Sequence, residues 1–339
     1  AAVMWIVAIG GNLSAFWILA ANGFMQHPVG YEIVNGRAQM TDFGALLGNP
    51  RALYLFLHTF FAGLVTAAFF VLGFSIYHLV RNHEVEAFKK SFYLSALIGL
   101  ISAVAVGLAG HAQGVYLREV QPMAAAASEA HYETADPADF HLIAGIDQEG
   151  RRTTWSITIP KALSFLYFFR FSGEVEGLNN IQAQYEALYG PGNYIPNIPL
   201  AFWSFRAMVG VGTLMVLLTA GALIIAWKKY PNKWIKRSGW LVWIIFLPYI
   251  ANTTGWILTE TGRQPWMVHG LMQTKDAVSP NLTPATVLIS LVGFVAIYAV
   301  LMAFDLFLLL KYAKKGLVTV EADSVPIAAV EAPKKRGGK

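Results

Sequence analysis

Residues 201–227 read AFWSFRAMVGVGTLMVLLTAGALIIAW, and this stretch decides the fold class. Arg206 is its only charged residue, and about 20 consecutive apolar residues suffice for a helix to cross the hydrocarbon core of a bilayer. The stretch therefore predicts a transmembrane helix. Five further stretches have the same character: 1–22, 52–80, 92–112, 238–258 and 286–311. We predict an all-α fold, a polytopic transmembrane helical bundle of about six spans.

The composition agrees with a membrane protein. Hydrophobic residues make up 56% of the 339 residues, charged residues make up 13%, and the mean hydropathy is +0.49. A soluble domain carries about a quarter charged residues. The high aromatic content of 14% suits rings that lie at the level of the lipid headgroups or pack against a large flat cofactor.

Cysteine is absent, which excludes several redox centres. Iron–sulfur clusters, blue-copper sites and covalently attached c-type haem all need thiolates, and external disulfides are excluded as well. Any haem is therefore held without a covalent link. The net charge of +5 does not indicate nucleic acid as a partner, because the basic residues lie between and after the apolar spans, where they orient a membrane protein.

The distribution of Lys and Arg predicts the topology. One set of connections holds Arg81, Lys89, Lys90, Lys228, Lys229, Lys233, Lys236, Arg237, Lys311, Lys314, Lys315, Lys334, Lys335, Arg336 and Lys339. The two short loops on the opposite side hold only Arg37, Arg51, Arg263 and Lys275. By the positive-inside rule the first set is cytoplasmic.

This topology divides the chain into four parts. We predict transmembrane helices over 1–112, one large external loop over 113–200, transmembrane helices over 201–311 and a basic cytoplasmic tail over 312–339, of which the last two dozen or so residues look disordered. Within the loop, Met123–Tyr132 predicts a helix and Trp155–Pro160 a short strand, and a stretch rich in Pro, Gly and Asn leads from Gly190 to Pro199.

Four polar or sulfur-containing side chains stand out in or at the ends of the spans: His58, Arg206, Met208 and Glu260. An ionisable group inside hydrocarbon costs roughly 2.5–3.5 kcal/mol on insertion scales, so each charged one is a functional candidate. Imidazole with thioether is an axial ligand pair of b-type haem. The alternatives are a hydrogen bond between helices for His58, plain packing for Met208, and snorkelling towards the membrane surface for the two charged residues.

The histidines of the predicted spans argue against a copper site. A haem–copper centre needs several membrane histidines, and only His58, His78 and His111 lie in or at the edges of the predicted spans. The sequence therefore favours haem without copper.

The run Gly255–Trp266, GWILTETGRQPW, closely resembles the signature of cytochrome bd subunit I, in which a Glu is followed three residues later by Arg-Gln-Pro-Trp. Further agreement comes from GNLSAFWIL at 11–19, ANGFMQ at 21–26, Asn49-Pro50 ahead of His58-Thr59, and FRAM at 205–208. The resemblance covers nearly the whole chain except the basic tail.

The resemblance implies a set of haem residues. His58 and Met208 would ligate a low-spin haem b, with Arg206 close to it. Glu260 would ligate one of two high-spin haems, a haem b and a haem d or a further haem b, with Arg263 near that site. Trp256 would pack between haems as an electron relay. Ser14 and Asn22 match positions associated with a proton or oxygen route, for which helix packing is the alternative reading.

In this family the loop between the third and fourth spans of this chain is the region of quinol oxidation. Gln121-Pro122-Met123 followed by Glu129 matches the start of its helix, and Glu129 would accept a quinol proton. Ala124 stands where the family commonly has Lys, which leaves the quinol contact open. The compact loop resembles the short-loop branch of the family.

The resemblance also implies an assembly in a bacterial or archaeal cell (inner) membrane. Its partners would be cytochrome bd subunit II, a small single-helix accessory subunit, quinol, O2 and membrane lipid. The family has roughly three more helices ahead of the first span, carrying a His ligand and paired Glu residues, so we expect this polypeptide alone not to reduce oxygen. Two other functions remain open: a membrane cytochrome b that oxidises quinol without touching O2, and a haem-free transporter.

Overall fold

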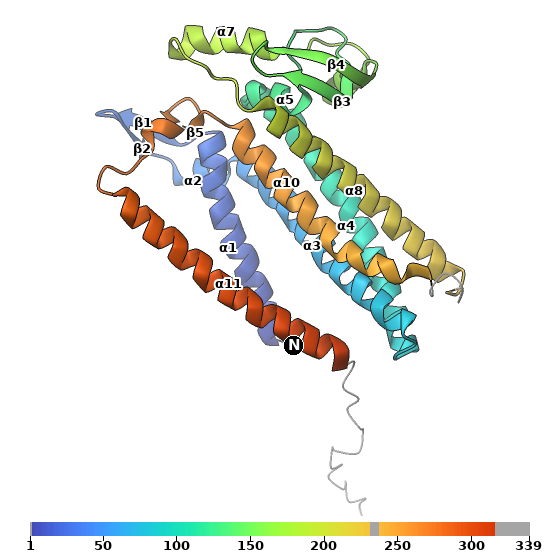
Figure 1. Ribbon diagram of the computed structural model, residues 1–339. Coiled ribbons are helices and arrows are strands. Elements are labelled where there is room, and N and C mark those ends of the chain that lie inside the picture. Colours follow the sequence, from blue (N-terminus) through green and yellow to red (C-terminus); the bar gives the residue numbers. More distant parts are fainter. Residues whose placement is uncertain (1, 231–236, 316–339) are drawn as a thin grey trace, which may run out of the picture. The chain divides into compact units, whose positions relative to one another are not determined.

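The computed structural model describes residues 2–230 and 237–315 (Figure 1). Six helical stretches in this part are long and apolar enough to cross a membrane: Ala2–Gln26, Phe43–Val80, Val85–Val120, Ile198–Trp227, Gly239–Gly262 and Pro284–Ala313. The predicted membrane-spanning helical fold is therefore confirmed. The chain forms two units, Ala1–Thr283 and Pro284–Lys339, and each is described by itself.

The long helices of the first unit are α1 (Ala2–Gln26), α3 (Pro50–Val80), α4 (Val85–Val120), α8 (Ile198–Trp227) and α10 (Leu247–Gly262). In the second unit, α11 (Pro284–Lys315) is a single apolar helix whose membrane-length window has none of its residues buried. Such a helix can only be stable in lipid or against another protein surface.

Two starts of long helices are set by an Asn followed by a Pro. The Asn49 side chain accepts a hydrogen bond from the backbone N–H of Arg51 at 2.9 Å, and Pro50 opens α3. The Asn197 side chain accepts from the N–H of Leu200 at 3.0 Å, and Pro199 lies in the first turn of α8. Both arrangements satisfy a free N–H of the first turn, and Pro there loses no helical hydrogen bond.

The structure changes the bounds of two predicted spans. The span predicted over 92–112 is longer, because α4 continues to Val120 and ends only where Pro122 disfavours helical geometry at Gln121. The helix predicted over 238–258 is in two parts. A 3₁₀ segment, η1 (Ser238–Phe246), precedes α10, which has Pro248 in its first turn.

Inside the membrane-spanning bundle the helices pack through a buried apolar core. Its fully buried members include Val65, Phe69 and Leu72 of α3 and Ala96 of α4. Gly99 of α4 brings two helices close, because a Cβ atom there would stand 3.0 Å from Cγ2 of Thr219 on α8. Small residues at such contacts let helix backbones approach each other in lipid.

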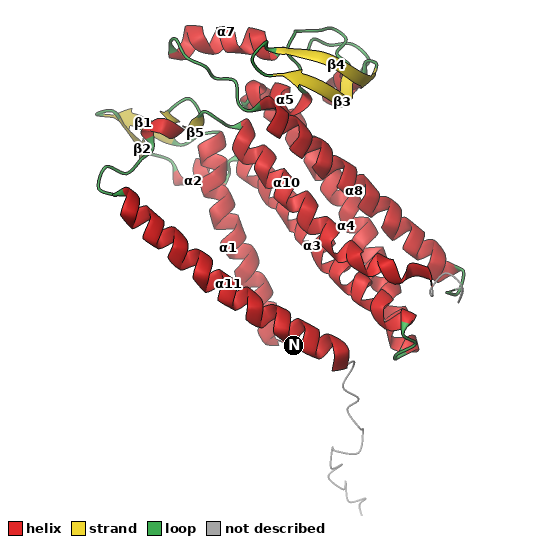
Figure 2. Cartoon of the chain, viewed as in Figure 1, coloured by secondary structure: helices red, strands yellow, loops and turns green. Residues whose placement is uncertain are grey.

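The segment between α4 and α8 holds the short elements (Figure 2). They are α5 (Pro122–Glu129), β3 (Phe140–Asp147), β4 (Arg152–Ile159), α6 (Ala162–Phe168) and α7 (Leu178–Tyr189). β3 and β4 pair antiparallel from Phe140↔Ile159 to Asp147↔Arg152. The strand predicted over 155–160 is thus part of a longer hairpin whose first strand was not predicted, and the helix predicted to reach Tyr132 ends at Glu129 because Ala130 is left-handed, with φ 49°.

Smaller elements lie in the two other connections on the same end of the bundle. Between α1 and α3 are β1 (Tyr31–Val34), β2 (Arg37–Met40) and α2 (Phe43–Leu47), and between α10 and α11 are β5 (Trp266–Val268), β6 (Met272–Gln273) and η2 (Thr274–Asp276). The β1–β2 turn is Asn35-Gly36, both with positive φ, a geometry that favours tight hairpins.

The short elements share one core with the ends of the long helices. Ala127 of α5, Ile181 of α7 and Phe202 of α8 are fully buried together, and Trp266 of the GRQPW run packs into the same cluster. This core fixes α5 against the end of the bundle at which α4 ends and α8 begins, which is called the loop end below (Figure 1).

Ile181→Ala tests this core. We expect the substitution to destabilise the α5–α7 region by about 2–5 kcal/mol, because it removes a fully buried side chain and leaves a cavity. Hydrogen exchange of the α7 amides measures the change in local opening. Leu188→Ala on the same helix is the matched control, since Leu188 is 70% exposed. Equal protection in the two variants would contradict the prediction.

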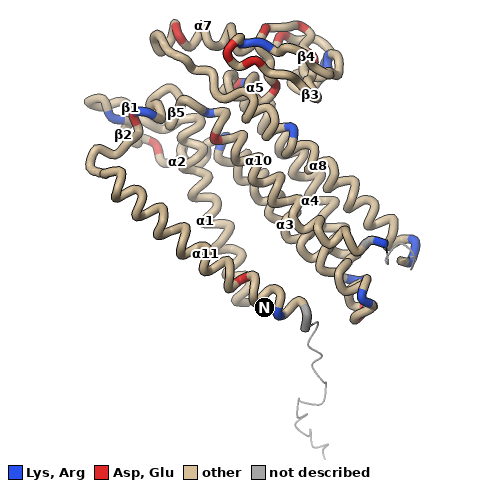
Figure 3. The backbone as a smooth tube through the Cα atoms, viewed as in Figure 1, with Lys and Arg blue, Asp and Glu red and all other residues tan. Residues whose placement is uncertain are grey.

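The charges separate along the bundle. Figure 3 shows Lys and Arg at the end of α3, α4 and α8 that lies away from β3, β4 and α7. Arg81 follows the last residue of α3, Lys89 lies near the start of α4, and Lys228 follows the last residue of α8. Lys233 and Lys236, and the tail residues from 316 onward that were predicted to be basic and disordered, lie outside the described residues.

Candidate functional site

His58 lies on α3, eight residues after Pro50 and so about 12 Å along the helix axis from its start. The ring lies beside the backbone of Val106 on α4, and Nδ1 is buried and has no hydrogen-bond partner among the described residues. A metal-ligating histidine commonly donates one ring N–H to a carbonyl and keeps the other nitrogen for the metal. In the described part of the chain, Nδ1 of His58 is such an unoccupied nitrogen.

Glycines of α4 leave room beside this ring. Gly107, Gly110 and Gly114 share one helix face, because they are three and four residues apart. A Cβ atom at Gly110 would stand 3.0 Å from Cε1 of His58, and Cβ atoms at Gly107 and Gly114 would meet nothing within 4 Å. The face next to His58 is therefore flat and open to a planar group.

Met208 lies on α8, ten residues after Ile198 and about 15 Å along the axis. It comes from the same loop end as His58 and lies at a similar depth. A Cβ atom at Gly255 of α10 would stand only 2.9 Å from Sδ of Met208, so the thioether fills the space that this glycine leaves. The imidazole nitrogen without a partner among the described residues, the thioether and the glycine face fit a haem, which His58 and Met208 would hold.

Arg206 connects α8 to the short elements. Its Nη2 donates to Oε2 of Glu129 at 2.6 Å, its Nε donates to the carbonyl of His141 at 2.7 Å, and its guanidinium lies 4.4 Å from the ring centroid of Phe202. Nη1 is buried without a partner among the described residues. One donor of Arg206 is thus available to an acceptor that the chain does not supply, such as a haem propionate.

Glu129 ends α5 and is buried, with 4% of its surface exposed. Burial raises the pKa of Glu129 to about 7, and the Arg206 guanidinium limits this rise. Burial also raises the pKa of Tyr167 on α6, and the nearby Glu129 charge raises it further. Glu129 is consequently a carboxyl group that can take up or release a proton near neutral pH.

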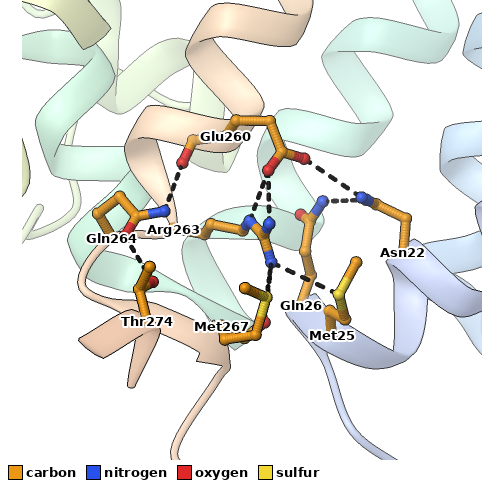
Figure 4. A network of polar contacts seen from close by, with 8 residues as sticks. All are labelled: Asn22, Met25, Gln26, Glu260, Arg263, Gln264, Met267 and Thr274. Atoms are coloured by element: carbon orange, nitrogen blue, oxygen red, sulfur yellow. Dashed lines mark hydrogen bonds and ion pairs between the residues drawn. The ribbon is translucent and has the colours of Figure 1, made fainter. Parts of the chain in front are cut away.

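Glu260 is the centre of the network in Figure 4. Its Oε2 accepts from Nε and Nη2 of Arg263 at 2.9 and 2.5 Å, and its Oε1 accepts from Nδ2 of Asn22 at 3.3 Å. Nη1 of Arg263 donates to the carbonyl of Met267 at 2.8 Å, and Gln264 bridges Glu260 and Thr274. Because a carboxylate has about four lone-pair positions, Glu260 keeps acceptor capacity for an iron.

The structure brings some predicted residues together and leaves others apart. Asn22 contacts Glu260, and Arg206 contacts Glu129. Ser14 is exposed on α1, and Trp256 is 43% exposed on α10, so neither joins these networks in the described part of the chain.

Sequence reasoning missed two buried residues beside Asn22. Gln26 donates to Oδ1 of Asn22 at 2.6 Å and accepts from Arg51, whose side chain was counted among the short-loop charges. Arg51 is 2% exposed. Its place directly after Asn49-Pro50, in the first turn of a long apolar helix, was the only available signal.

Ala124, which stands at a Lys position of the resembled family, packs on the GRQPW run. Its Cβ would lie 3.5 Å from a Cβ atom at Gly262. A small cavity beside it is lined by Gln121, Met123, Ala124, Tyr185, Gly262, Arg263, Gln264, Trp266 and His269. The titratable side chains of this lining are Tyr185, Arg263 and His269, and Glu129 of α5 is not part of it.

Comparison with protein families decides the identity. Residues 1–317 match the model of the family described as cytochrome bd terminal oxidase subunit I. The chain belongs to this family. The resemblance inferred from GRQPW and the other motifs is confirmed, and with it the assignment to the oxidoreductases that act as terminal oxidases in membranes.

Relatives from three bacteria agree. The chain is 45% identical to cytochrome bd ubiquinol oxidase subunit 1 of Bacillus subtilis (strain 168) over 328 residues, which are 96% of this chain and 70% of that protein. It is 30% identical to cytochrome bd-II ubiquinol oxidase subunit 1 of Escherichia coli (strain K12), over 95% of this chain and 74% of that protein. The structure of bd oxidase from Geobacillus thermodenitrificans matches with a TM-score of 0.79 and 30% identity, over 92% of this chain and 69% of that one.

Membership of the cytochrome bd subunit I family implies haem cofactors, a quinol substrate and a role as a terminal quinol oxidase. The roles of individual residues, the haem types and the side of the membrane on which the loop lies stay predictions.

Proposed function

We propose that this chain is the haem-bearing subunit of a cytochrome bd terminal oxidase that oxidises quinol beside α5 and reduces O2 to water. The observation that carries the proposal is the ion pair of Glu129 with Arg206 at 2.6 Å. It joins a proton-accepting carboxyl of the quinol-oxidation segment to a residue two positions before Met208, the expected haem ligand. Proton release and electron release from quinol would therefore occur at neighbouring groups.

The cofactor assignment follows the donor atoms. His58 and Met208 would hold the low-spin haem b, and Glu260, supported by Arg263 and Asn22, would hold one of two high-spin haems, haem b and haem d or a further haem b. Bound haem would supply the one-electron transfer from quinol to oxygen. Arg263 would hold Glu260 in one orientation while it is a ligand.

The proton chemistry lies with Glu129. As a carboxylate it would accept a proton from the hydroxyl of bound quinol, and its pKa of about 7 suits this role at neutral pH. Arg206 would orient the carboxylate and stabilise its charge.

Proton release on one side of the membrane and proton uptake on the other would generate a proton motive force without a pump. We propose that the segment over 113–200 lies outside the cell and that the basic connections and the C-terminus are cytoplasmic, in agreement with the charge distribution in Figure 3. Protons from quinol would leave outside, whereas those for water formation would come from the cytoplasm. The partners would be cytochrome bd subunit II and a small single-helix subunit in a bacterial or archaeal cell membrane.

The experiment that tests the proposal is pyridine haemochrome analysis of the purified complete complex, together with quinol-driven oxygen uptake. We expect bound haem and oxygen consumption. A colourless complex would favour a haem-free transporter, and a haem-containing complex that oxidises quinol without consuming oxygen would favour a membrane cytochrome b.

Glu260→Gln distinguishes a terminal oxidase from a membrane cytochrome b that does not reduce O2. We expect oxygen uptake to fall by about 100-fold or more while the low-spin haem band stays, because a high-spin haem ligand is removed and the His58–Met208 site is untouched. Optical spectra and an oxygen electrode measure both. Glu119→Gln, whose side chain is 60% exposed, is the matched control and should keep wild-type uptake. Undiminished oxygen uptake in Glu260→Gln would show that oxygen reduction does not need the Glu260 carboxylate.

A further inference from the structure

Arg51 is a buried cation without a counter-charge among the described residues. Its side chain is 2% exposed, and Nε and Nη2 both donate to one neutral oxygen, Oε1 of Gln26, at 2.8 and 2.5 Å. Nη1 is buried and has no partner among the described residues. None of the ion pairs in the described part of the chain includes Arg51.

Such an arrangement is unfavourable unless an anion completes it. Removing a guanidinium from water is costly, and a neutral amide compensates only part of the loss. The neighbouring groups do not help, because Gln26, His27, Tyr116 and His58 are neutral or basic. Arg51 also lies in the first turn of α3, where the free N–H groups and the helix dipole favour negative charge further.

The position of Arg51 points to a particular anion. Arg51 precedes His58 by seven residues on the same helix, so the two lie on one face, about 10 Å apart along the axis. Through Gln26 and Asn22 it is also connected to Glu260. Arg51 is therefore linked to both residues that the proposed function assigns to iron, to His58 along α3 and to Glu260 through hydrogen bonds.

We propose that Arg51 binds a propionate carboxylate of a haem, through Nη1 and the charge of its guanidinium. The inference rests on the haem sites of the proposed function but concerns a residue that they do not include. Two haems could supply the carboxylate, the one at His58 or the one at Glu260. In either case Arg51 is a positioning residue that stabilises the added electron on the haem to which it is paired.

The test compares the reduction equilibria of the haems in the complete complex carrying Arg51→Gln, Arg51→Lys or the wild-type residue. Loss of the positive charge is expected to shift one haem at least tenfold towards its oxidised form, which corresponds to about 59 mV for one electron. Arg51→Lys should keep most of the wild-type value. A shift confined to the low-spin band assigns the propionate to the His58 haem, and a shift of a high-spin band assigns it to the Glu260 site.

Arg37→Gln is the matched control, because Arg37 lies exposed on β2 in the connection between α1 and α3, and no band should shift in it. Intact haem content with no shift in any band of Arg51→Gln overturns the inference but leaves the proposed function in place. A wild-type complex without haem overturns the proposed function, and this inference with it.

Gln26→Glu keeps the test decisive if Arg51→Gln does not fold. The new carboxylate would compete with the propionate for Arg51, so we expect the same band to shift towards the oxidised form and the propionate bending mode in the resonance Raman spectrum to change. If Arg51 has no other anion, Gln26→Glu forms a new ion pair, raises the Tm and leaves the haem bands unchanged. That result would overturn the inference.

Discussion

Replacing His58 with alanine is expected to remove the low-spin haem from the complex. The imidazole has one nitrogen without a hydrogen-bond partner among the residues that the structure describes, lies beside Gly110 of α4, and lies at a depth similar to that of Met208. His58 would be one of the two residues that hold this haem, and a haem that loses one of its two protein ligands is expected to lose its low-spin state. We expect the reduced low-spin band to disappear and quinol-driven oxygen uptake to fall to background. Reduced-minus-oxidised difference spectra measure the first effect, and an oxygen electrode measures the second.

His111→Ala is the control for this prediction. His111 lies on α4 towards the same end of the bundle and packs its ring edge-on against Phe169, 5.3 Å between centroids. The His111→Ala complex should keep the low-spin haem band. A His58→Ala complex with an unchanged low-spin band would exclude His58 as a ligand and remove the basis of the electron path proposed here.

Replacing Glu129 with glutamine is expected to slow quinol oxidation by about 10²–10⁴-fold, the usual contribution of a positioned acid–base group. Glutamine keeps the size of the side chain and a hydrogen-bond acceptor for Arg206, so haem content should remain close to that of the wild type. Steady-state turnover with a soluble quinol, normalised to haem, measures the effect. Glu149→Gln, an exposed carboxylate in the β3–β4 turn, should leave turnover unchanged. Full turnover in Glu129→Gln would exclude this carboxylate as the proton acceptor.

The same residue predicts a pH dependence. Because burial raises the pKa of Glu129 to about 7, the carboxylate that accepts the quinol proton forms as the pH rises through that value. Wild-type turnover should therefore increase from pH 6 to pH 8, and the increase should be absent in Glu129→Gln. The effect on stability has the opposite sign. The folded state holds a proton that the unfolded chain releases at its ordinary pKa, so stability due to this group falls as the pH rises from about 4.5 to about 7.

Much of the fold was predictable because it depends on local composition. A backbone inside lipid must satisfy its own hydrogen bonds, so each long apolar run becomes a helix whatever its neighbours are. All six predicted spans are helical on this basis. The two departures have local causes that hydropathy does not register, namely Pro122 after α4 and Pro248 at the start of α10.

The segment between α4 and α8 was harder to predict. β3 is mostly apolar without a regular alternation, and it has two shifts of register, so alternation alone does not identify it. The hairpin is stabilised by its neighbours, since Thr153 donates to the carbonyl of Ala130 and Arg206 donates to that of His141. Those partners come from other elements.

The sequence by itself determined that this protein spans a membrane, that it belongs with the cytochrome bd subunit I family, and which imidazole, thioether and carboxylates are its functional candidates. Only the tertiary structure decided which charges meet. It paired Glu129 with Arg206, 77 residues away, and it placed Arg51 against Gln26, with no ion pair to a carboxylate in the part of the chain that the structure describes. Hydropathy and helix starts are local properties of the chain, whereas burial and charge pairing depend on segments that come together only when the helices pack.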